Sequence, residues 1–138
     1  MIEKKTLSLD SAKRIAAAAA DHARANGWPV AIAVVDEGAN LLYFERLEGT
    51  MLGSIETSIG KARSSVLFKR PTKALEDIII GGRNVMMNLP QAVPIQGGVP
   101  LTHEGNLIGG IGVSGVLSPQ DEEVALAGAA IHVGREAL

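Results

Sequence analysis

The chain has 138 residues, a formal net charge of −2 and no cysteine. This length suits one domain with its own hydrophobic core, so we expect residues 1–138 to form a single domain. The lack of cysteine excludes disulfides and zinc sites with cysteine ligands, and the balanced charge, without basic clusters among aromatic residues, argues against nucleic-acid binding.

The first predicted element is a helix that Ser8 or Asp10 can cap and that ends at Asn26, before Gly27 and Pro29. Its apolar stripe consists mostly of alanine, and a stripe of such small residues either packs closely on a sheet or leaves room for a flat ligand. The members of the stripe are Ala12, Ile15, Ala16, Ala19 and Ala23. The apolar run of this helix is too short for a secretory signal, and no later window is long enough to span a membrane. We therefore expect a soluble cytoplasmic protein that does not bind membranes.

A β-hairpin follows, in which "VAIAVVD" and "LLYFERL" are strands and Gly38 and Asn40 shape the turn between them. The first strand is apolar on both faces, which predicts a central position in the sheet. Apolar residues then recur at helical spacing between Met51 and Val66, and a second short helix follows Pro71.

A second hairpin is predicted near residues 99–114, with "HEGN" as its turn. The last helix starts at Ser118, with Pro119 at its first helical position and Asp121 in the place of a capping-box acid. Consecutive hairpins favour an antiparallel sheet over the βαβ alternation of a parallel one. The expected fold class is thus α/β of the α+β type, an antiparallel sheet flanked by helices.

The segment "NLIGGIGVSG" has the GxGxxG spacing of a dinucleotide-binding turn, through Gly110, Gly112 and Gly115. Such a turn needs a helix directly after it and a further strand that carries an acidic residue. Here the next helix opens only at Ser118 and no strand follows. We therefore favour a strand that another backbone or a ligand approaches closely.

Three histidines could bind a metal: His22, His103 and His132. His22 lies on the edge of the alanine stripe, where an imidazole could reach the iron of a large planar cofactor that lies against small side chains. It could equally be a half-exposed histidine that the dipole of the helix C-terminus favours. Solvation in a hairpin turn explains His103, and packing or exposure on the last helix explains His132.

Charged residues offer a second kind of site. Asp36 ends a buried strand, where its carboxylate can stabilise the turn or act as a base in a pocket. Arg46, Lys61 and Arg63 could hold a substrate carboxylate, although single basic residues are mostly solvated.

Four segments together resemble the family of GlcG and HbpS, which includes the C-terminal domain of PduO; they are "VAIAVVDEGANLLYFERLEG", "GKA", "PIQGGVPL" and "GNLIGGIGVSG". The resemblance implies a profilin-like three-layer domain, homo-oligomers of up to eight copies and, in several members, bound haem. It also implies that His22, in "DHARANG", is an axial haem ligand. The sequence departs from the pattern typical of this family at "RLEG" and "KARSS", which are the surroundings of Arg46 and Lys61.

Our leading hypothesis is a non-catalytic haem-binding protein for storage, sensing or an accessory role, with His22 on the iron. In this hypothesis the backbone of four glycines lines the pocket: Gly97, Gly98, Gly110 and Gly112. The alternative is a catabolic enzyme or accessory protein for a hydroxy or keto acid, a diol or an aromatic-pathway intermediate. Its pocket would lie between the sheet and the first helix, with Asp36 as base and Arg46 or Lys61 as the carboxylate holder. A third hypothesis is a non-catalytic assembly or sensor subunit.

Overall fold

The computed structural model describes residues 1–131, so His132 lies outside the described residues. The elements follow in the order α1 (Leu9–Ala25), β1 (Ala31–Asp36), β2 (Leu41–Arg46), α2 (Ser54–Leu67), α3 (Thr72–Ile80), a 3-10 helix η1 (Asn84–Asn88), β3 (Gly98–His103), β4 (Asn106–Ser114) and α4 (Ser118–Ala129). None of these helices is long and apolar enough to cross a membrane.

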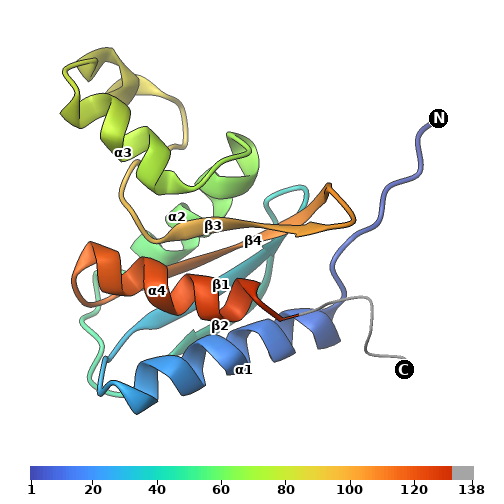
Figure 1. Cartoon of the computed structure of the whole chain (residues 1–138), viewed down its shortest axis with the longest axis vertical. Helices are drawn as coiled ribbons and strands as arrows, with labels where there is room; N and C mark the ends of the chain where they lie inside the picture. The colour runs from blue at the N-terminus through green and yellow to red at the C-terminus, as the bar shows by residue number, and fades with distance from the viewer. Residues whose placement is uncertain (132–138) are drawn as a thin grey trace.

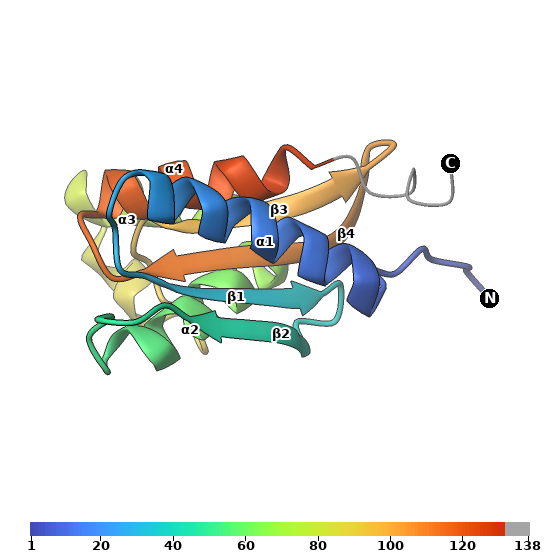
Figure 2. The same ribbon diagram turned by 90° about the horizontal axis from the view of Figure 1, so that it is seen from below.

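The four strands form one antiparallel sheet in the order β2-β1-β4-β3. Helices α1 and α4 lie on one side of this sheet and α2 lies on the other, while α3 lies past the edge of the sheet that β3 forms (Figure 1). Figure 2 shows α1 and α4 running side by side over the strands. The predicted fold, an antiparallel sheet between helical layers with β1 in the centre, is confirmed.

Local signals set the ends of the elements. Ser8 is the N-cap of α1, and its hydroxyl accepts a hydrogen bond from the Ser11 amide at 3.1 Å. Gly27 follows the helix with a φ of +70°, a conformation that glycine adopts without a steric penalty. The turn between β3 and β4 has positive φ at Glu104 and Gly105, as a two-residue hairpin loop requires.

Helix α4 begins at Ser118, as predicted, but its capping residues differ from the prediction. Leu117, not Ser118, is the N-cap, and the Gln120 side chain accepts a hydrogen bond from the Leu117 amide at 3.3 Å. Gln120 therefore has the capping role that we assigned to Asp121. The Asp121 side chain turns inward instead, as described below.

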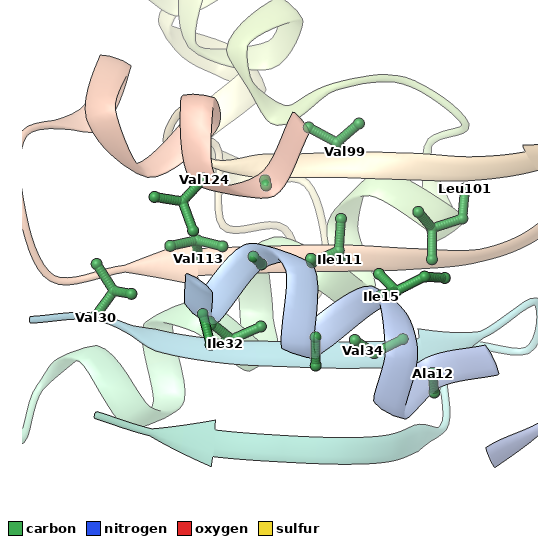
Figure 3. Packing of buried hydrophobic residues seen from close by; sticks show 14 of the residues in the cluster. Ala12, Ile15, Val30, Ile32, Val34, Val99, Leu101, Ile111, Val113 and Val124 are labelled. Carbon is green, nitrogen blue, oxygen red and sulfur yellow. The ribbon is translucent and has the colours of Figure 1, made fainter. Parts of the chain in front are cut away.

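The larger core lies between the sheet and the layer of α1 and α4 (Figure 3). The alanine stripe of α1 is fully buried there, so it packs closely and leaves no room for a ligand. The two helices also approach each other closely: a Cβ on Gly128 of α4 would lie 2.9 Å from the Ile15 carbonyl oxygen and 3.3 Å from the Ala19 Cβ. Small side chains thus set a short distance between α1 and α4.

The opposite face of the sheet packs against α2. Apolar spacing locates this helix correctly, but Met51 precedes it and is exposed, and the buried face consists mainly of small residues. These are Ser54, Ser58, Ala62, Ser64 and Ser65, with Lys61 among them. The hydroxyls of Ser58, Ser64 and Ser65 donate to carbonyls of their own helix, at 2.7 to 2.9 Å. Because these hydroxyls are already hydrogen-bonded within α2, the serine face needs no further hydrogen-bond partner and can lie directly on the sheet.

Candidate functional site

His22 lies in the last turn of α1, on the side that faces α4. Its Nε2 is 2.7 Å from the Oε2 atom of Glu123 on α4, and 34% of its side chain is exposed. The rings of Trp28 and His22 meet edge to face, with a centroid distance of 6.1 Å and an interplanar angle of 62°. Two contacts therefore orient an imidazole that solvent can still reach.

The exposed residues next to His22 in the chain are mainly polar, namely Asp21, Arg24 and Asn26, and two exposed apolar side chains lie on the same stretches of the two helices. Ala25 is exposed on α1, and Leu126, one turn after Glu123 on α4, is half exposed. The described residues contain no group of three His, Asp or Glu side chains that could hold a metal ion. A single imidazole suits an axial haem position, because the porphyrin nitrogens supply the other ligands of the iron.

The four glycines of the predicted pocket all face α2. A Cβ on Gly112 would collide with the backbone of Ser58 and Ala62, and one on Gly98 would collide with the Lys61 carbonyl. A Cβ on Gly110 would meet Ser65 and Ala62 in the same way, and one on Gly97 would meet the Val113 carbonyl of β4 and the Lys61 side chain of α2. The prediction of a strand approached by another backbone is confirmed, and α2 occupies the space that we assigned to a cofactor.

Lys61 is almost fully buried, contrary to the expectation of a solvated cation. Its Nζ donates to Oδ2 of Asp121 at 3.1 Å and to the Val113 carbonyl at 2.9 Å. Burial lowers the pKa of Lys61, and the Asp121 charge opposes this shift. Burial likewise raises the pKa of Asp121, against the effect of Lys61. The carboxylate that Lys61 holds thus belongs to its own chain, and the role of Asp121 was missed in the sequence.

Asp36 stabilises the turn between β1 and β2. Its Oδ1 accepts hydrogen bonds from the Gly38 amide at 2.9 Å, the Asn40 amide at 3.0 Å and the Asn40 side chain at 3.2 Å. These contacts match the turn-stabilising alternative, in which the side chain folds back on its own backbone.

Asp36→Ala is therefore expected to lower the free energy of unfolding by about 1 to 2 kcal/mol, because three donors lose their common acceptor. Urea denaturation followed by circular dichroism measures this difference. Asp36→Asn keeps an acceptor oxygen and serves as the control, with a smaller loss expected. Equal stability of Asp36→Ala and the natural chain would contradict the structural role.

Arg46 lines a groove of about 640 Å³ between the end of α1 and the end of β2. Trp28 and Leu47 contribute apolar surface to this groove, and Arg24, paired with Glu45 at 3.1 Å, lies on its rim. The groove lies at the ends of α1 and β2, beside the loop after α1, and not in the predicted place between the first helix and the sheet, because the buried alanine stripe of α1 fills that space.

The three candidate catalytic residues, Asp36, Arg46 and Lys61, do not meet in this groove. Arg46 pairs with Ala31 at the start of β1, whereas Asp36 ends the same strand. Five residues of extended strand separate these positions by roughly 16 Å. Lys61 is buried on the other face of the sheet, so the structure brings none of the three together.

Comparisons with known proteins agree on one family. Residues 7–130 match the family model described as "Haem degrading protein HbpS-like". Protein GlcG of Escherichia coli is 38% identical over 114 residues, which are 83% of this chain and 85% of GlcG.

Two solved structures share the fold over nearly all of the chain. A double mutant of HbpS from Streptomyces reticuli has a TM-score of 0.87 and 33% identity, covering 94% of this chain and 89% of that one. A structure described as a PduOC:Heme complex has a TM-score of 0.83 and 28% identity, covering 91% of this chain and 94% of the other. With this match in sequence and in fold, the chain belongs to the HbpS-like family.

Proposed function

We propose that this chain binds haem and that His22 supplies an axial ligand to the iron. The observation that carries the proposal is the position of His22, a half-exposed imidazole at the seam between α1 and α4. Support also comes from the family, described as haem degrading, and from the relative solved as a complex with haem.

Residues around His22 would hold the macrocycle by contact. Leu126 and Ala25 offer apolar surface on the two helices, and Trp28 holds the imidazole from the side of the loop after α1. Haem, when bound, supplies an iron centre for redox chemistry or for ligand binding. Haem at His22 does not involve Gly97, Gly98, Gly110 or Gly112, because α2 occupies the space beside these glycines.

Assembly into homo-oligomers of up to eight copies is a further part of this proposal. Apolar side chains on α3 and η1 support it, since Ile80, Val85 and Met87 are each more than half exposed. A contiguous exposed apolar patch marks a protein contact, and a contact between copies of this chain would cover these side chains. Light scattering after size exclusion measures the assembly, and a monomer at all concentrations would contradict it. A cytoplasmic location stays a prediction.

The test of haem binding is a titration of the purified protein with hemin, followed by absorption. The natural chain is expected to give a sharpened Soret band, and His22→Ala is expected to lose it and to bind about tenfold more weakly or worse, because the iron loses its nitrogen ligand. His103→Ala is the matched control, since His103 lies on β3 and should leave the spectrum unchanged. Identical titrations for His22→Ala and the natural chain would show that the ligand assignment is wrong.

A further inference from the structure

We propose that Glu123 is a latch that occupies the ligating nitrogen of His22 in the haem-free protein, so that haem loading requires this side chain to withdraw. The inference rests on the proposed function, because it concerns how the same site is regulated. Its basis is the contact between Nε2 of His22 and Oε2 of Glu123, which joins α1 to α4 at 2.7 Å.

Nε2 is also the nitrogen that iron would need. Nδ1 is bonded to Cγ, the ring atom that carries Cβ, so a broad macrocycle centred on Nδ1 would run into the backbone of α1. Nε2 is not bonded to Cγ and lies at the far side of the ring from Cβ, where it has no such obstruction. The carboxylate and the iron therefore compete for one atom of His22.

The two partners also demand different proton positions on the imidazole. An ionised carboxylate only accepts hydrogen bonds, so the Nε2 of His22 carries the hydrogen when it contacts Glu123. Ligation uses the Nε2 lone pair, so that proton must pass to Nδ1 or to solvent as Glu123 withdraws. A bond to iron and the contact with Glu123 thus exclude each other.

Glu123 is able to move without disturbing the fold. Its side chain is 56% exposed, and His22 is its only hydrogen-bond or ion-pair partner within residues 1–131. The helix itself is fixed by the neighbouring residues Asp121 and Val124, which are buried. A side-chain rotation on a fixed helix is sufficient to free the imidazole.

The opposite role for Glu123 would be that of a carboxylate that stays bound to a ligating histidine and orients it. That role requires iron on Nδ1, which the backbone of α1 obstructs. The two roles predict opposite effects of removing the carboxylate, and this makes them separable.

The experiment compares Glu123→Ala, Glu123→Gln and a matched control, Glu122→Gln, which removes one charge from the adjacent position of α4. Hemin titration should give a dissociation constant about two- to fivefold lower for Glu123→Ala, because an exposed ion pair no longer competes. Glu123→Gln should lie between this variant and the natural chain, and Glu122→Gln should match the natural chain.

A second readout needs no haem. Diethyl pyrocarbonate attacks a ring nitrogen that carries a lone pair, and in the contact with Glu123 this is Nδ1, the nitrogen nearer the backbone, whereas the more open Nε2 becomes available when Glu123 is removed. Mass spectrometry measures the rate at each histidine. His22 should react about two- to fivefold faster in Glu123→Ala, and His103 in the same sample is the internal reference.

Equal modification rates at His22 in Glu123→Ala and the natural chain would overturn the latch, whatever the hemin titration shows. Faster modification combined with unchanged or weaker hemin binding would show that the contact does not control loading. If His22→Ala binds hemin like the natural chain, His22 is not the iron ligand and that part of the proposed function is wrong. The modification rates still decide whether Glu123 blocks His22.

Discussion

Gly112→Ala is expected to lower the free energy of unfolding by about 3 kcal/mol or more. The added methyl group would collide with the carbonyl oxygen of Ser58 and the amide of Ala62, which are backbone atoms of α2. Backbone cannot rotate away as a side chain can, so α2 as a whole would have to shift from the sheet. Urea denaturation, with the slope compared between variants, measures this loss.

Gly53→Ala is the control for the effect that a glycine-to-alanine change has on the conformational freedom of the unfolded chain. Gly53 precedes α2 with a φ of −60°, and a Cβ there would meet no atom within 4 Å. The same chemical change should therefore leave stability unchanged or raise it by up to about 1 kcal/mol. If the two variants were equally stable, the contact between α2 and β4 would not be as close as the structure shows.

The second large effect concerns the buried ion pair. Lys61→Met and Asp121→Asn are each expected to cost about 3 to 5 kcal/mol, because each leaves one buried charge without its counter-charge. The double variant removes both charges, and the side-chain amide introduced by Asp121→Asn would keep an acceptor for the Val116 amide, which Asp121 binds at 3.1 Å. The double variant should therefore lose much less than the sum of the two single changes.

The directions of the two pKa shifts support this expectation. In the folded chain the raised pKa of Asp121 means that it binds its proton at a higher pH than in the unfolded chain, so its contribution to stability falls as the pH rises through that interval. The lowered pKa of Lys61 means that it releases its proton at a lower pH than in the unfolded chain, so its contribution rises as the pH approaches the ordinary value for lysine. Both shifts show that burial disfavours the charged forms. Additive losses in the double variant, measured by denaturation at neutral pH, would contradict coupling between the two residues.

Much of the fold is readable in the sequence because its signals are local. Ser8 and Gly27 mark the ends of α1, "HEGN" marks a hairpin turn, and the apolar "VAIAVVD" indicates a central strand. Each of these patterns depends on neighbours within a few residues. The alternation of hairpins and helices then favours an antiparallel sheet, which the structure confirms.

The parts that could not be predicted depend on distant partners. Lys61 and Asp121 are 60 residues apart, and nothing near Lys61 in the sequence indicates a buried counter-charge. The glycines of β4 reveal that something approaches the strand, but they do not reveal whether it is a helix or a cofactor. His22 is proposed from its position on the first helix and from the family resemblance, whereas nothing near His22 in the sequence indicates its contact with Glu123, 101 residues away.

The small side chains between α1 and α4 have a consequence for the chemistry of His22. Gly128 lies against Ala19 and the Ile15 carbonyl, and it sets how far apart the two helices stand. The length of a glutamate side chain is limited, so Glu123 can contact an imidazole on the neighbouring helix only if the two helices lie close together. The distance between α1 and α4 thus determines whether Glu123 reaches His22. One methyl group added at position 128 would increase this distance and leave Nε2 of His22 free of the carboxylate.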